Sequence, residues 1–388
     1  MTIRHILTAV SAVCGLGLAA AAADEIKVGV IAPFSGPFAQ YGIQYQQAIE
    51  AFQSQHGTVA GEHEITFIYK DVGGVNPDQS RALAQELLIR DRVDYLAGFT
   101  FTPNALAVGP VITQSETPTV IFNAATSTIN KESPFYLRTS YTLPQVSAPA
   151  AEWAYDQGIR TVVTTVTDYG PGIDAETAFK AAFEAKGGEV IESVRMPLST
   201  TDFTPILQRV KDEAPDAVFT FLPGGPPTFS YTKTYNENGL REAGIIFLGT
   251  AETEEINLQG LGEMAEGLQT VYHYSPAHDS EANRAFLTAL SELHPDAIAN
   301  WASVGAYDGV HLIYEMVEAA GSDGPKAVEA ALGLKWESPR GPLEMDPETR
   351  TVIQNVYIRE VALNAETGLL ENVEQGVIAT VGDLGWTK

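Results

Sequence analysis

The stretch IKVGVIAPF at residues 26–34 is an apolar, β-branched run, and it leads through GPFAQYG (residues 36–42) into the helical pattern IQYQQAIEAF (residues 43–52). This order predicts a buried strand, a short loop and a helix. The same order returns at residues 159–188, where IRTVVTTV leads through TDYGPG into DAETAFKAAFEAK. One strand–loop–helix unit therefore occurs twice, which predicts two lobes of similar structure.

A Tyr-Gly pair stands at the strand-to-helix junction of each copy, Tyr41-Gly42 in the first and Tyr169-Gly170 in the second. Such a junction exposes backbone N–H groups and the positive end of a helix dipole, which favours an anion. Matching junctions in two similar lobes predict a ligand bound between them.

Short apolar runs alternate with helical patterns along both halves, which predicts an α/β fold of two doubly wound parallel sheets. In the first half, the predicted strands are Lys27–Ala32, Ile65–Tyr69, Tyr95–Gly98 and Thr119–Phe122. In the second half they are Thr161–Val166, Glu189–Arg195, Ala217–Leu222 and Ile245–Leu248. Ligands of such sheets bind beyond the carboxyl ends of the strands, so the loops after the strands are the candidate site.

These loops form three matching pairs. The first half contributes GPFAQYG, FTFTPNA and NAATS, and the second contributes TDYGPG, LPGGPP and GTAETEE. Beyond Thr250, the amphipathic stretch Ser280–Leu293, the helix Ala302–Ala319 and the alternating segment TVIQNVYIREV predict further crossings between the lobes. Three crossings, near residues 139–145, 270–277 and 348–356, predict a hinge that permits closure. The predicted lobes are residues 24–139 plus 276–350, and residues 140–275 plus 351–388.

The first 23 residues have the pattern of a secretory signal peptide. Arg4 supplies a positive start, Ile6–Leu18 is apolar, and Ala19–Ala23 offers a cleavage site. The only cysteine, Cys14, falls inside this segment, and a lipoprotein anchor is an alternative, although the preceding residues match the Leu-x-small pattern poorly. We expect a periplasmic protein without disulfides.

The formal charge of −26 repels nucleic acid, and no basic cluster offsets it. The chain has no G-x-S-x-G elbow, HExxH motif or Walker loop, and its histidines lack metal-ligand spacing. These patterns predict a binding protein without a cofactor rather than an enzyme.

Several motifs together resemble a known family: IKVGVIAPFSGPFAQYG, AAT at Ala124–Thr126, DYGPG at Asp168–Gly172, GAYDGVHLIYE at Gly305–Glu315 and SPRGPLEMDPETR at Ser338–Arg350. The chain resembles the periplasmic solute-binding proteins of branched-chain-amino-acid ABC transporters, the Leu/Ile/Val-binding type. The resemblance implies a type I bilobed fold that closes around a small ligand and delivers it to an ABC permease in the inner membrane. We expect a monomer.

The resemblance also implies ligand-binding positions. The family's carboxylate-binding loop falls on Phe101 and Thr102, and its small residue and threonine fall on Ala124 and Thr126. Its two tyrosines, one from each lobe, fall on Tyr41 and Tyr169.

The chain departs from the amino-acid binders at two loops of the second lobe. Ala251 falls near an acid that meets the ligand's ammonium group in those proteins, with Glu252 beside it. Pro223 and Gly224 replace a frequent aromatic residue and leave space for a ring. His273 lies at a predicted crossing.

Two ligand classes remain open at this point. The first is a small hydrophobic carboxylate such as a benzoate or phenylpropanoid, and the second is an amino acid like leucine, isoleucine or valine. A ligand-sensing module on the same fold is a third possibility.

Overall fold

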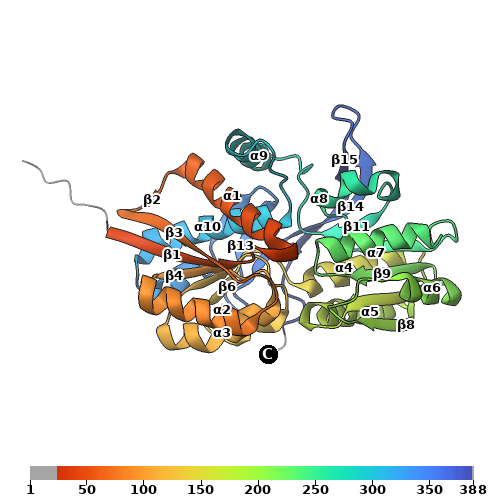
Figure 1. Ribbon diagram of the computed structural model, residues 1–388, viewed down its shortest axis with the longest axis horizontal. Helices are drawn as coiled ribbons and strands as arrows, with labels where there is room; N and C mark the ends of the chain where they lie inside the picture. Colours follow the sequence, from red (N-terminus) through yellow and green to blue (C-terminus); the bar gives the residue numbers. More distant parts are fainter. Residues whose placement is uncertain (1–23, 387–388) are drawn as a thin grey trace, which may run out of the picture.

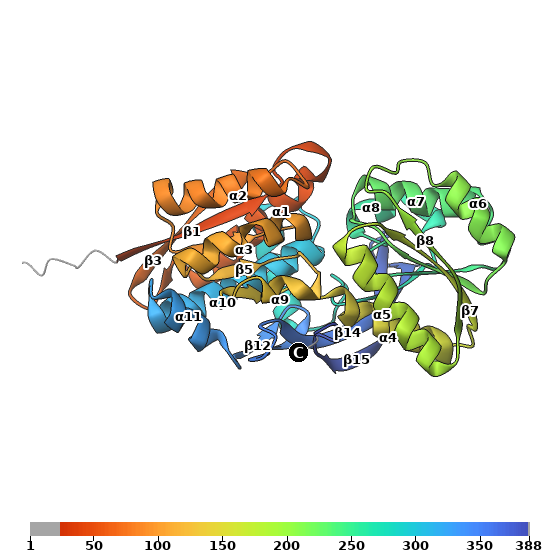
Figure 2. The same ribbon diagram turned by 90° about the horizontal axis from the view of Figure 1, so that it is seen from below.

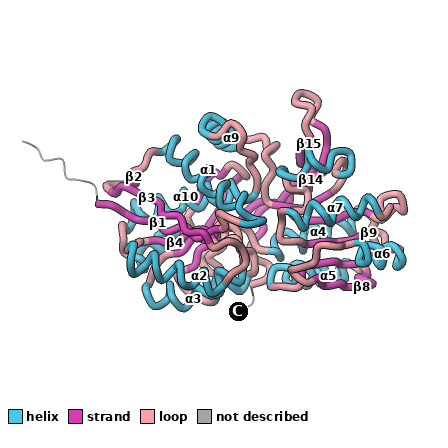
Figure 3. The backbone as a smooth tube through the Cα atoms, in the orientation of Figure 1, coloured by secondary structure: helices cyan, strands magenta, loops and turns pink. Residues whose placement is uncertain are grey.

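The computed structural model describes residues 24–386, which form two α/β lobes lying side by side (Figures 1 and 2). The predicted signal segment lies outside the described residues. Helices and strands alternate through both lobes (Figure 3). Within residues 24–386, no helix is both long and apolar enough to cross a membrane.

The first lobe contains a six-stranded sheet. Its order is β2 (Val59–Ala60), β3 (His63–Asp71), β1 (Asp24–Ala32), β4 (Tyr95–Gly98), β5 (Thr119–Ile121) and β6 (Tyr136–Arg138). All neighbours are parallel except β2 and β3. Its helices are α1 (Ala39–His56), α2 (Pro77–Glu86), α3 (Thr102–Ser115), α9 (Glu281–Leu293), α10 (Trp301–Ala320) and α11 (Gly324–Ala331). Figure 1 shows α1 and α10 on one face of the sheet and α2 and α3 on the other.

Helices on both faces explain why β1 from Val28 to Ala32 is a continuous buried run of apolar residues and glycine. Val28 and Val30 are fully buried in the core that includes α1 and α10, whereas Ile31 belongs to the core under α2 and α3. A strand covered on both faces gains from an apolar residue at every position, unlike a half-exposed strand that alternates.

The second lobe contains a nine-stranded sheet. Its parallel part runs β8 (Glu189–Met196), β7 (Thr161–Thr167), β9 (Ala217–Phe221), β10 (Ile246–Gly249) and β11 (Gln269–Tyr272). The antiparallel strands are β14 (Val352–Leu363), β15 (Leu370–Val381), β13 (Gly341–Met345) and β12 (Lys335–Ser338). Its helices are α4 (Leu143–Asp156), α5 (Gly170–Lys186), α6 (Thr204–Glu213), α7 (Pro226–Glu237) and α8 (Glu255–Leu261).

The chain passes between the lobes at three places. It leaves the first sheet between β6 and α4, returns between β11 and α9, and enters β14 close to β6, where Arg138 and Thr351 form an isolated bridge. We keep the predicted division of the chain into two lobes as a proposal. Strands β12 and β13 pair with β14 of the second sheet, although their residues fall within the predicted first lobe. Two α/β lobes with helices on both faces of each sheet agree with the predicted fold class.

Candidate ligand-binding site

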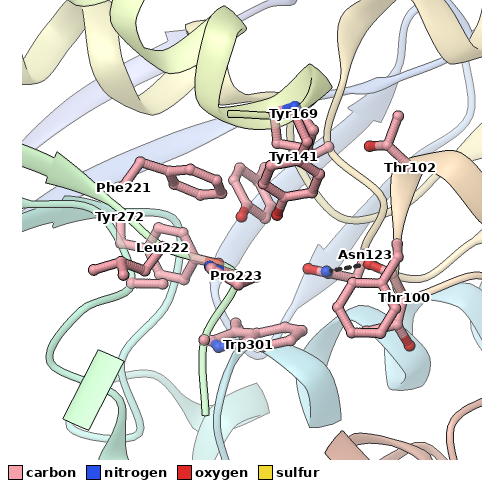
Figure 4. A pocket seen from close by; sticks show the side chains of 15 residues that line it. Thr100, Thr102, Asn123, Tyr141, Tyr169, Phe221, Leu222, Pro223, Tyr272 and Trp301 are labelled. Carbon is pink, nitrogen blue, oxygen red and sulfur yellow. Dashed lines mark hydrogen bonds between the residues drawn. The ribbon is translucent and has the colours of Figure 1, made fainter. Parts of the chain in front are cut away.

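A cavity lies between the lobes, where the loops after the strands of both sheets meet (Figure 4). It contains about 390 Å³ of space outside the protein atoms, part of it open to solvent. The first lobe lines it with Thr100, Phe101, Thr102, Asn123, Ala125 and Trp301. The second lobe lines it with Tyr169, Pro171, Phe221, Leu222, Pro223, Gly224, Ala251 and Tyr272, and Tyr141 comes from the first crossing.

The first lobe presents hydroxyl and amide groups to the cavity, gathered on one side of Figure 4. Thr102 begins α3, and its Oγ1 donates to Oγ1 of Thr126 at 3.1 Å. The side-chain amide of Asn123 donates to the carbonyl of Thr100 at 2.8 Å. Thr102 stands at the N-terminus of α3 and Asn123 in the loop after β5, and neutral donors beside a helix N-terminus can bind an anion without a full counter-charge.

An aromatic wall faces these polar groups (Figure 4). The ring of Tyr169 stacks on Phe221 with centroids 6.2 Å apart, and Tyr141 meets the edge of Tyr272 at 5.0 Å. Burial raises the pKa of Tyr169 and that of Tyr141 well above the ordinary value. Both side chains therefore keep their phenolic protons at neutral pH and can donate hydrogen bonds.

Among the described residues, the cavity lining contains no Asp, Glu, Lys, Arg or His side chain. Its side-chain polar groups are hydroxyls, one amide and the indole N–H of Trp301, which donates to Glu254. The site can therefore hold one charged group only through neutral hydrogen-bond partners.

Five of the predicted site residues line the cavity: Phe101, Thr102, Tyr169, Pro223 and Gly224. Thr126 lies just behind the lining as the hydrogen-bond partner of Thr102. Ala124 packs into the core under α2 and α3, and its neighbour Ala125 takes the place at the cavity.

The remaining three predicted residues lie outside the lining. Tyr41 donates its hydroxyl to Glu254 Oε1 at 2.7 Å. Glu252 turns to its own lobe, where it accepts the N–H groups of Leu222 and Thr250, and burial raises its pKa to about 7. His273 is fully buried and stacks on Tyr141 at 4.7 Å, and burial lowers its pKa well below the ordinary value.

Several lining residues were absent from the sequence prediction, including Thr100, Asn123, Tyr141, Tyr272 and Trp301. Tyr141 and Tyr272 lie where the chain crosses between lobes, and no local pattern marks a crossing residue as part of a site. Trp301 opens α10 after the N-cap Asn300, so its sequence context indicates only a helix start.

The chain matches the family model described as periplasmic binding protein over residues 25–367. It is 49% identical over 378 residues to a Brucella abortus protein named Leu/Ile/Val-binding protein homolog 6, covering 96% of this chain and 97% of that one.

Solved structures of other solute-binding proteins resemble this chain at a similar sequence identity. A solute-binding protein of an ABC transporter from Rhodopseudomonas palustris HaA2, in complex with p-hydroxybenzoic acid, has a TM-score of 0.91 and 48% identity. Another from R. palustris, in complex with 4-hydroxybenzoate, has a TM-score of 0.90 and 47% identity. Each match covers 93% of this chain and 99% of the other. The family and these relatives are binding proteins, so the sequence expectation of a non-enzyme with a type I periplasmic binding fold is confirmed. The chain belongs to the periplasmic binding protein family and is a solute-binding protein of an ABC transporter.

Proposed function

We propose that this protein captures a hydroxylated aromatic carboxylate of the hydroxybenzoate type in the periplasm and delivers it to an ABC permease. The observation that carries the proposal is the lining of the cavity. Neutral donors lie on one side, aromatic rings lie on the other, and the described lining residues include no charged side chain.

This lining favours a carboxylate over a zwitterionic amino acid. A bound leucine would place its ammonium group in the cavity, and an ammonium buried without an ionic partner costs several kcal/mol. Ala251 lies in the lining where an acidic partner would be required, and the acids beside it, Glu252 and Glu254, are engaged elsewhere.

The aromatic wall suits a ring with a hydroxyl group. Phe221, Tyr169 and Trp301 offer ring faces and edges, which favour an aromatic ligand over an aliphatic one of equal size. The hydroxyls of Tyr141 and Tyr169 can exchange hydrogen bonds with a ring hydroxyl. Two relatives solved with 4-hydroxybenzoate and p-hydroxybenzoic acid support this ligand class.

The name of the Brucella relative favours a second candidate, a leucine-like amino acid. A thermal-shift panel separates the two candidates on protein stripped of ligand by unfolding and refolding. The panel contains benzoate, 4-hydroxybenzoate, 3,4-dihydroxybenzoate, leucine, and 4-methylpentanoate, which is leucine without its ammonium group.

We expect 4-hydroxybenzoate at one hundred times its Kd to stabilise the protein by about 2.7 kcal/mol, with no shift from leucine. A shift from leucine together with none from 4-methylpentanoate or the benzoates would contradict the proposal, because it would require an ammonium partner.

A further inference from the structure

We infer that Glu254, which lies outside the cavity, is the positioning residue that holds the lobes closed over the ligand and fixes Trp301 as a cavity wall. The inference rests on the proposed function and adds to it a residue that controls how long the ligand stays bound.

Glu254 joins the two lobes through buried hydrogen bonds. Tyr41 Oη of α1 and Trp301 Nε1 of α10 both donate to Glu254 Oε1, each at 2.7 Å. All three side chains are at most 5% exposed. Both donors belong to helices of the first lobe, whereas Glu254 lies between β10 and α8 of the second.

The carboxylate is anchored in its own lobe by its other oxygen. The N–H of Gly225, at the start of α7, donates to Glu254 Oε2 at 2.9 Å. Oε1 of Glu254 therefore accepts hydrogen bonds from the first lobe, and Oε2 accepts one from the second. Burial raises the pKa of Glu254 to about 7, while the bonds from Gly225, Tyr41 and Trp301 favour its ionised form. Hydrogen bonds to an ionised carboxylate are about twice as strong as those between neutral groups, so this contact favours the closed arrangement.

The glycine at position 224 permits this close approach of the lobes. Gly224 has φ of +86°, and a Cβ there would lie only 2.3 Å from Tyr41 Oη. Any side chain would strain the backbone and push Tyr41 away from Glu254.

Trp301 connects Glu254 to the cavity, because it contacts both. Its ring lines the cavity and packs on Tyr41 with centroids 4.6 Å apart, while its N–H is held by Glu254. Loss of the carboxylate weakens the bond that holds the indole of Trp301. The cavity lining at Trp301 and the contact between the lobes therefore change together. The neighbouring acid Glu255 bonds within its own lobe, where it accepts from the side-chain amide of Asn372 and pairs with Arg359.

The test measures lobe closure and ligand release in the same molecules. Fluorescent dyes on Lys326→Cys and Lys233→Cys, in a Cys14→Ser background, report the distance between α11 and α7 by energy transfer. The probe ligand is 4-hydroxybenzoate. The variants are Glu254→Gln, Tyr41→Phe and Trp301→Phe, and Glu255→Gln is the matched control.

We expect each of the three variants to release 4-hydroxybenzoate about tenfold faster, with a smaller change in the association rate, since each loses or weakens a contact made on closure. Tyr41→Phe and Glu254→Gln should be non-additive by at least threefold, because both act on the Tyr41–Glu254 hydrogen bond: the first removes its donor, and the second removes the charge that strengthens it. Glu255→Gln should lower the melting temperature but keep the release rate within twofold.

Unchanged release rates and closed fractions in Tyr41→Phe and Trp301→Phe, with melting temperatures like that of the unsubstituted protein, would overturn the inference. If 4-hydroxybenzoate changes neither the energy transfer nor the melting temperature of the unsubstituted protein, the proposed ligand fails instead. In that case leucine replaces it as the probe, and the same comparison of release rates decides the role of Glu254.

Discussion

Replacing Arg340 with methionine is expected to lower the free energy of unfolding by about 3–5 kcal/mol, because it leaves a buried carboxylate without its counter-charge. Arg340 Nε pairs with Asp308 Oδ2 at 2.9 Å, and both side chains are at most 1% exposed. The guanidinium also donates to the carbonyls of Thr139 and Ser140 at the first crossing and to Gln354 Oε1 on β14. One side chain therefore connects α10 with two of the three crossing segments.

Urea unfolding of Arg340→Met measures this effect, with Lys335→Gln as the control. Lys335 pairs with Glu344 at 3.0 Å on the same β12–β13 hairpin whose turn contains Arg340, but its side chain is 70% exposed, so its loss should cost less than about 1 kcal/mol. Adding Asp308→Asn to Arg340→Met should recover part of the lost free energy of unfolding, because the unpaired negative charge of Asp308 is then removed as well. Equal costs for Arg340→Met and Lys335→Gln would show that the buried pair does not stabilise the crossings.

Ala251→Asp is expected to weaken binding of 4-hydroxybenzoate by at least about one hundredfold. Ala251 lines the cavity, is only 7% exposed and follows β10 in the second lobe. A carboxylate introduced there would add a second negative charge to a poorly solvated cavity that also holds the ligand's carboxylate, and like charges in such surroundings repel strongly.

Ala251→Asn separates charge from bulk, because the asparagine amide has nearly the same shape as the aspartate carboxylate and no charge. Titration calorimetry of both variants should give a much smaller loss for Asn than for Asp. Equal losses would assign the effect to bulk alone and would remove the argument that the cavity selects against a second charge.

Much of the fold follows from patterns within the sequence. The boundaries of β4 match the prediction, and β1, β3 and β7 extend theirs by only a few residues. In β4 and in the second half of β1 the signal is a continuous buried run, which is typical of a strand covered on both faces. Helix α4 was not predicted: Pro149 lies inside it and argues against a helix, although Thr142 and Gln145 form a local capping box at its start. Packing on α5 supplies tertiary stabilisation that no local pattern contains.

The site was less accessible to sequence analysis. The rule that ligands bind beyond the carboxyl ends of parallel strands predicted the loops FTFTPNA and TDYGPG. The family resemblance then pointed to Phe101, Thr102 and Tyr169 within them. The role of Glu254 depends on contacts across 213 residues to Tyr41 and 47 residues to Trp301, which no local pattern contains. Glu252 and Glu254 are two positions apart in one loop, and only the folded backbone distinguishes the acid that faces its own lobe from the acid that faces the other.

The proposed function requires a cavity that accepts an aromatic carboxylate and rejects an ammonium group. The most direct measurement is a calorimetric titration of the refolded, ligand-stripped protein with 4-hydroxybenzoate, in the absence and then in the presence of a large excess of leucine. We expect saturable binding of one molecule per chain with an unchanged Kd when leucine is present. Saturable heat from leucine, with none from 4-hydroxybenzoate, would contradict the account.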